Sequence, residues 1–177
     1  MVKSVRRIAM IAAFILVFYL LQTTICTWIF PHTAVPNLLL ILTLSVGLLR
    51  GRIEGMFAGF FCGLMMDIFS GGMLCFYSLI YMYIGYLNGV LRKSLVSDLP
   101  LLPMLLCGLS EVLYHTYIYI FSFLLRNRLD FTVYLEDVVM PELIVTILAG
   151  ILFYGIILAV NHVLEKKEKE GASKFVS

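Results

Sequence analysis

Long uncharged stretches constrain this chain more than any other feature of its sequence. Residues 8–30 carry no formal charge over 23 positions, and five further apolar stretches follow at 36–49, 55–69, 73–91, 99–125 and 138–163. A helix needs about 20 apolar residues to cross a bilayer. It also pairs its backbone groups within itself, as hydrocarbon requires. The sequence therefore predicts an all-α integral membrane protein, a bundle of six transmembrane helices.

The shorter apolar stretches leave an alternative open. As a helix, the 14 residues 36–49 would rise about 21 Å, less than the roughly 30 Å hydrocarbon core. Only Arg50-Gly51-Arg52-Ile53-Glu54 separates this stretch from the next one. Either flanking residues complete both crossings, or the pair forms a re-entrant hairpin. We favour two crossings because six spans also organise the charges.

Basic residues predict the orientation. With six crossings and the N-terminus inside, the inner segments hold 11 of the 13 Lys and Arg: Lys3, Arg6, Arg7, Arg50, Arg52, Arg92, Lys93, Lys166, Lys167, Lys169 and Lys174. Cytoplasmic loops are enriched in these residues. We expect both termini to be cytoplasmic. The expected domains are a basic N-terminal segment (1–7), a single transmembrane domain (8–163) and a charged tail (164–177).

Composition excludes several classes of function. The chain is 62% hydrophobic and 14% charged, with a net charge of +2, whereas soluble domains are about half apolar and a quarter charged. This excludes a water-soluble enzyme domain and a nucleic-acid module. The sequence contains no GxSxG, HExxH or Walker A motif. We expect no enzymatic activity, no cofactor and no metal ion.

Small residues recur at every fourth position in the first half of the chain. The series is Gly47, Gly51, Gly55, Gly59 and Gly63, and it is continued by Asp67 and Gly71. Positions i and i+4 share one face of a helix, and small residues let two helices approach closely. This groove either docks a partner helix or packs against a helix of the same chain. Asp67, followed by Gly71 and Gly72, either caps the next helix or binds a partner.

Four polar side chains interrupt the apolar stretches: Asn37, Glu111, His115 and Glu142. Glu111 and His115 share a helix face. They could bind a metal, although two ligands are too few; they could relay protons; or they could satisfy each other in a buried contact. Glu142 follows Pro141, a pair typical of a helix start. Tyrosines such as Tyr81 are expected partly at the membrane interfaces.

Several motifs between residues 36 and 92 resemble the rod shape-determining protein MreD family. They are Pro36-Asn-Leu-Leu-Leu-Ile-Leu, Gly47-Leu-Leu-Arg-Gly51, Gly59-Phe-Phe-Cys-Gly-Leu-Met-Met-Asp-Ile-Phe-Ser-Gly-Gly72 and Gly85-Tyr-Leu. Two positions depart from the family pattern. Cys75 stands where a Gly-Gly-x-x-Gly ending would place a glycine, and Asn37 stands where the family often has Asp.

The resemblance implies a multi-pass protein of the bacterial cytoplasmic membrane that serves as a non-enzymatic scaffold for cell-wall elongation. Its implied partners are membrane lipid, a periplasm-facing protein like MreC and, indirectly, an actin-like MreB filament, a RodA-like glycosyltransferase and a class B penicillin-binding transpeptidase. The family looks distantly similar in fold to the S components of ECF vitamin transporters. An alternative function is therefore that of a small-molecule-binding S component.

Overall fold

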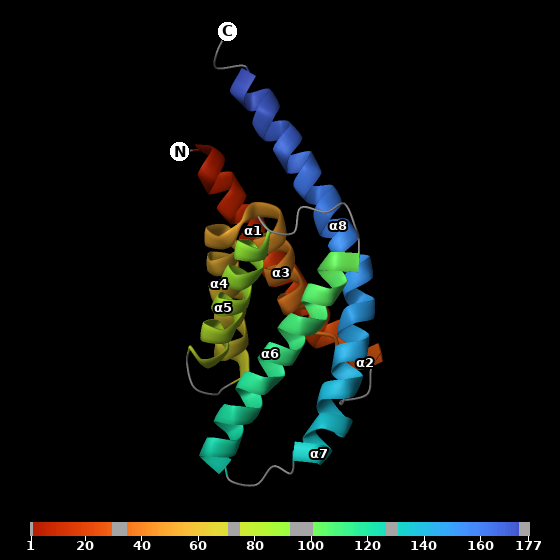
Figure 1. Ribbon diagram of the computed structural model, residues 1–177. Helices are drawn as coiled ribbons and strands as arrows, with labels where there is room; N and C mark the ends of the chain where they lie inside the picture. The colour runs from red at the N-terminus through yellow and green to blue at the C-terminus, as the bar shows by residue number, and fades with distance from the viewer. Residues whose placement is uncertain (1, 30–34, 71–74, 93–100, 127–130, 174–177) are drawn as a thin grey trace.

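The computed structural model describes residues 2–29, 35–70, 75–92, 101–126 and 131–173, and all regular elements among them are helices (Figure 1). In chain order they are α1 (Val2–Leu20), the π-helical η1 (Leu21–Cys26), α2 (Thr27–Ile29), α3 (Leu38–Arg50), α4 (Arg52–Ser70), α5 (Phe76–Leu91), α6 (Leu101–Arg126), α7 (Phe131–Tyr134), the π-helical η2 (Leu135–Val139) and α8 (Met140–Ser173). Gly71 and Gly72 lie outside the described residues.

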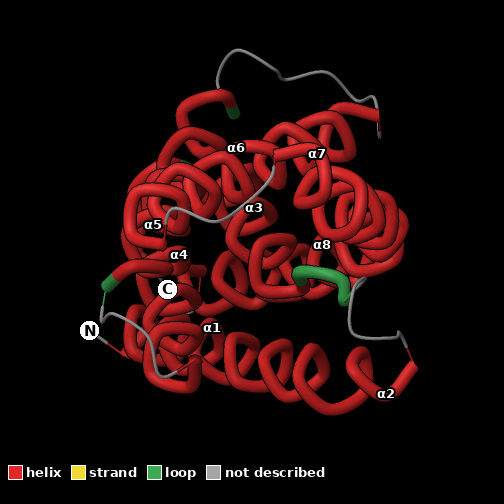
Figure 2. Tube along the Cα trace, turned by 90° about the horizontal axis from the view of Figure 1, so that it is seen from below, coloured by secondary structure: helices red, strands yellow, loops and turns green. Residues whose placement is uncertain are grey.

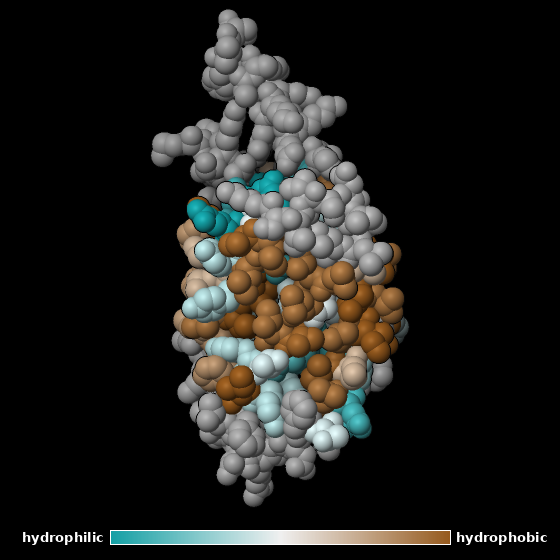
Figure 3. Space-filling view, in the orientation of Figure 1, coloured by the Kyte–Doolittle hydropathy of each residue, from teal (hydrophilic) through white to brown (hydrophobic). Residues whose placement is uncertain are grey.

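Within the described residues, four helical stretches are long and apolar enough to cross a membrane: Met10–Ile29, Arg52–Ser70, Pro103–Phe121 and Leu135–Asn161. Hydrophobic side chains cover the middle of the face drawn in Figure 3, and hydrophilic ones lie towards both its upper and its lower end. The expected all-α membrane fold is confirmed, while the count of six crossings remains a prediction. Helix α1 begins and α8 ends on the same side of the bundle (Figure 1), as an even number of crossings requires.

The short helix α3 forms the centre of the bundle. Residues 36–47 are all buried, and α1, α4, α5, α6 and α8 all contact α3 (Figure 2). A helix that is apolar on every side belongs in an interior. Its 13 residues span only about 20 Å. Because protein surrounds this helix, its length does not have to match the thickness of the hydrocarbon core.

The glycine series holds α4 against its own neighbours. A Cβ atom added to Gly59 would collide with the backbone carbonyl of Tyr81, and one added to Gly63 would collide with the backbone of Ser78. In return, a Cβ on Gly85 would collide with the carbonyl group of Gly55. The α4 and α5 backbones therefore nearly touch along this face, side by side in Figure 1, and no room is left there for a partner helix.

The same series also joins α3 to α4. A Cβ on Gly55 would lie 2.6 Å from the Cα of Gly47 and 2.6 Å from the carbonyl oxygen of Gly85, so three helices meet at this point. Gly51 is the single residue between α3 and α4 and has φ 101°. Glycine adopts this backbone conformation without a steric penalty. The chain can thus reverse direction in one residue.

The last helical run begins earlier than the sequence predicts. The sequence places a helix start at Pro141, but helix is already present from Phe131 through α7 and η2, and α8 runs on to Ser173. Proline lacks an N–H group and normally disturbs a helix interior. Here the wider π-helical turn η2 precedes it, which is one way to accommodate the missing backbone hydrogen bond.

A left-handed residue precedes α5. Cys75 has φ 70° and ψ 7°, and its side chain is exposed. This conformation costs an L-residue about 1–2 kcal/mol and costs glycine almost nothing. The departure from the expected glycine at this position therefore leaves local strain.

We expect Gly59→Ala to destabilise the protein by about 1–3 kcal/mol, because the new methyl group overpacks the α4–α5 contact. The measurement is the thermal unfolding midpoint of purified protein in detergent. The matched control is Gly155→Ala in α8, where nothing lies within 4 Å of the added Cβ. An unchanged midpoint for Gly59→Ala would contradict the backbone contact described above.

We expect Cys75→Gly to raise the unfolding midpoint by removing about 1 kcal/mol of backbone strain. Cys75→Ala removes the same thiol but keeps a Cβ, so it should leave the midpoint where it is. If both variants shift the midpoint equally, the thiol and not the backbone is responsible.

Candidate functional site

The N-terminus of α3 lies inside the protein, and side chains from three segments pair its backbone. The Leu39 N–H donates to Oε1 of Gln22 (3.2 Å), and the Leu40 N–H donates to Oδ1 of Asn37 (3.2 Å). The Asn37 N–H donates to Oγ1 of Thr146 on α8 (3.1 Å). The first N–H groups of any helix lack partners within the helix. These contacts supply the partners far from water.

Tyr81 joins this group from α5. Its hydroxyl donates to Oδ1 of Asn37 at 2.6 Å, and the residue is fully buried. Tyr114 of α6 packs against it edge to face, with ring centroids 5.7 Å apart. The Tyr81 hydroxyl thus finds its hydrogen-bond partner inside the bundle, as buried tyrosines usually do.

Two carboxylates and one imidazole converge next to Asn37. Nε2 of His115 lies 3.5 Å from Oε1 of Glu111 and 3.5 Å from Oε2 of Glu142. Glu111 is fully buried and its carboxylate interacts with the side chain of Asn37, although neither oxygen meets strict hydrogen-bond geometry within the described residues. Nδ1 of His115 is 3.1 Å from the hydroxyl of Tyr134. Glu111 and His115 thus lie in a buried polar contact that also includes Glu142 of the neighbouring helix α8.

Together these residues form a polar core, which consists of Gln22, Asn37, Tyr81, Glu111, His115, Tyr134, Glu142 and Thr146. Three of them lie in or next to a π-helical segment or at the start of a helix. Gln22 lies in η1, Tyr134 directly precedes η2, and Asn37 caps α3. Single π-helical turns within helices are often found at functional sites. In this chain η1 carries Gln22 into the core, and η2 directly follows Tyr134.

Sequence reasoning found four members of the core and missed four others. Asn37, Glu111, His115 and Glu142 were singled out as polar residues in apolar surroundings, and the fold brings them together. Gln22 had the same signal, since it lies within the uncharged stretch 8–30. Tyr134 lies between the apolar stretches 99–125 and 138–163, outside every predicted transmembrane helix. Thr146 and Tyr81 carried no signal, because both residue types are common in transmembrane helices.

Asp67 lies outside the polar core, near the C-terminal end of α4, and has a different role. Its Oδ1 accepts from the Tyr77 N–H (2.8 Å), and its Oδ2 accepts from the N–H (2.9 Å) and the hydroxyl of Ser78. Asp67 is 2% exposed. A carboxylate at a helix N-terminus satisfies free N–H groups and the helix dipole. This carboxylate therefore caps α5, as the capping alternative for Asp67 expects.

The fold and the polar core define a class, a multi-pass α-helical membrane protein with polar groups inside and apolar side chains outside. The protein-family model for rod shape-determining protein MreD matches residues 3–162. The chain belongs to the MreD family and is a rod shape-determining membrane protein. No curated protein and no solved structure matches it.

We expect Asn37→Leu to destabilise the protein more than any exposed substitution of similar size. The change leaves the Leu40 N–H and the Tyr81 hydroxyl without their acceptor, at about 1–3 kcal/mol for each buried group. Thermal unfolding in detergent measures the loss. Thr116→Val is the control, because the Thr116 hydroxyl is exposed and bonds only to its own helix at Val112. Equal midpoints for the two variants would count against the role of Asn37.

Proposed function

We propose that this protein is a non-enzymatic membrane scaffold of the bacterial elongation machinery, needed for rod shape and lateral peptidoglycan synthesis. In this proposal it lies in the cytoplasmic membrane with both termini in the cytoplasm and binds an MreC-like periplasm-facing protein. It connects indirectly to an MreB-like actin filament, a RodA-like glycosyltransferase and a class B penicillin-binding transpeptidase. Membership of the MreD family supports the general role in rod shape.

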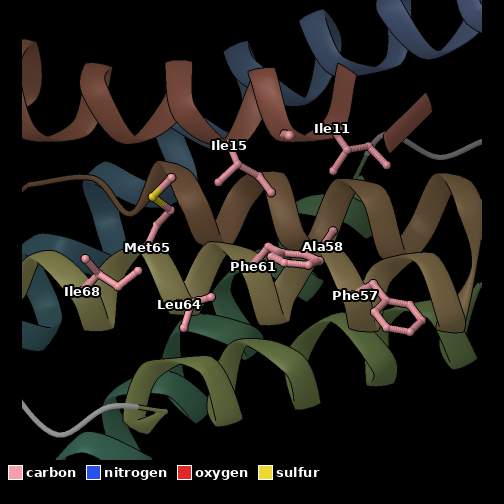
Figure 4. Close-up of a pocket in the computed structure, with 9 residues that line it drawn as sticks. Ile11, Ile15, Phe57, Ala58, Phe61, Leu64, Met65 and Ile68 are labelled. Carbon is pink, nitrogen blue, oxygen red and sulfur yellow. The ribbon is translucent and has the colours of Figure 1, made fainter. Parts of the chain in front are cut away.

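An apolar groove between α1 and α4 is the observation that carries the scaffold role. Figure 4 shows Ile11 and Ile15 of α1 on one wall and the side chains of α4 on the other. The cavity measures about 280 Å³. Phe57 and Phe61 are 55% and 50% exposed along it, and Ile68 is 56% exposed near its end. The groove lies on two of the helices that are long enough to span a membrane.

The groove suits a transmembrane helix of the partner. Helix α4 has two different faces, because its glycines are in contact with α5 while Phe57 and Phe61 point away from that contact. Lipid is as apolar as these side chains, so association inside a membrane depends on how many atoms pack closely. A concave surface offers more contact atoms to an inserted helix than a flat helix face does. We therefore assign the groove to the transmembrane segment of the MreC-like protein.

The experiment replaces Phe57 and Phe61 by alanine together in a rod-shaped bacterium that lacks its own MreD. We expect normal abundance of the variant, at least tenfold less MreC-like protein recovered with it, and rounded cells. The substitutions remove two phenyl rings from the wall of the groove, so an inserted helix loses packing atoms. The glycine contact between α4 and α5 stays intact. The measurements are membrane abundance, co-purification and cell width.

A double substitution of Leu148 and Leu152 to alanine is the matched control. These residues are 58% and 70% exposed on α8, away from the groove. The control should keep both the partner and the rod shape. If the two double variants recover equal amounts of the MreC-like protein, the groove does not hold this partner.

A further inference from the structure

Three side chains with atoms that can bind a metal meet in the polar core. The proposed scaffold role does not explain why they are there. Glu111 and His115 of α6 and Glu142 of α8 each offer one ligand atom, and these atoms all lie within 4.8 Å of one another. Helices α6 and α8 run side by side in Figures 1 and 2. The cluster therefore lies between two long helices that residues 127–139 separate in the sequence.

The spacing of the ligand atoms fits a shared metal ion. Metal–ligand bonds of about 2.0–2.2 Å in a tetrahedral site place neighbouring ligand atoms about 3.3–3.6 Å apart. Nε2 of His115 lies 3.5 Å from one oxygen of Glu111 and 3.5 Å from one oxygen of Glu142. These distances are too long for strong hydrogen bonds. They match two edges of a tetrahedron around one ion, and the third pair, the two carboxylates, lies within 4.8 Å, so the carboxylates would close in around a bound ion.

The histidine is oriented as a ligand. Its Nδ1 lies 3.1 Å from the hydroxyl of Tyr134. Its Nε2 is buried, faces both carboxylates and has no hydrogen-bond partner in the part of the chain that the structure describes. Metal-binding histidines commonly use the second ring nitrogen to bond a neighbouring group, which fixes the ring. Tyr134 is placed to be this orienting residue.

Buried charge gives the physical reason for a cation. Glu111 is fully buried, and its carboxylate is approached by the Asn37 side chain and by Nε2 of His115 without a hydrogen bond of strict geometry within the described residues. An ionised carboxylate in an apolar interior is very unfavourable unless an opposite charge balances it. A divalent cation would balance the negative charges of Glu111 and Glu142. It would also bind the ligand atoms that all three side chains offer.

We propose that Glu111, His115 and Glu142 bind one divalent transition-metal ion of the Zn²⁺ class, which fastens α6 to α8. Two carboxylates and one imidazole, without a thiolate, suit such ions of borderline hardness. Three protein ligands leave one position for water. A cavity of about 290 Å³ reaches His115 beside Tyr134, and the Glu142 side chain is 20% exposed, so an ion has a path to the site.

The test uses the full chain in lipid nanodiscs, treated with a chelator and then titrated with Zn²⁺ alone. We expect one zinc per chain after desalting and a higher thermal unfolding midpoint with zinc than without it. Co²⁺ in place of Zn²⁺ should give the visible absorption of a four-coordinate site. Glu111→Gln and Glu142→Gln should each weaken zinc binding at least tenfold. Tyr134→Phe keeps all ligands and should weaken it about 10–100-fold.

Glu136→Gln is the matched control, because this nearby carboxylate is exposed and lies outside the cluster; it should keep full zinc binding. Wild-type protein that retains well under one zinc per chain overturns the proposal. So does zinc binding as tight in Glu111→Gln and Glu142→Gln as in Glu136→Gln. If the ligand variants do not fold, wild-type stoichiometry and the Tyr134→Phe affinity decide the question.

Discussion

The structure depends on one constraint: the first turn of α3 is buried where no water can pair its backbone N–H groups. Three side chains supply the pairing, Gln22 from η1, Asn37 at the start of the helix itself, and Thr146 from α8. Each unpaired group would cost about 1–3 kcal/mol in this interior. A single requirement thus fixes three segments relative to each other, although they are far apart in the sequence.

The glycine contact and the polar core are linked through Tyr81. Its backbone carbonyl lies against Gly59, and its hydroxyl donates to Asn37. Bulkier residues along α4 would hold α5 further out and move this hydroxyl away from its acceptor. The close approach of two helices in one part of the bundle therefore supports hydrogen bonding in another.

The two proposals concern different parts of the molecule. The groove lies between α1 and α4 and faces outward, whereas the three metal-binding side chains lie inside, between α6 and α8. On α4 the glycine face packs against α5, and a different face lines the groove. Internal packing and partner binding therefore do not compete for the same surface. An ion that fastens α6 to α8 would stiffen the bundle without touching the groove.

The sequence by itself determined the helical membrane class and the close-packing series of glycines, because these depend on apolar length and on residues near one another in the chain. It left two alternatives for Asp67, and the structure shows the capping of α5. The sequence could not bring Glu142 to Glu111 and His115, since spacing within one helix offered only two ligands. It also placed the last helix start at Pro141, where η2 instead continues a helix from Phe131. Only the tertiary structure decided which distant polar groups meet, because buried polar groups must find partners wherever the packing of apolar helices brings them.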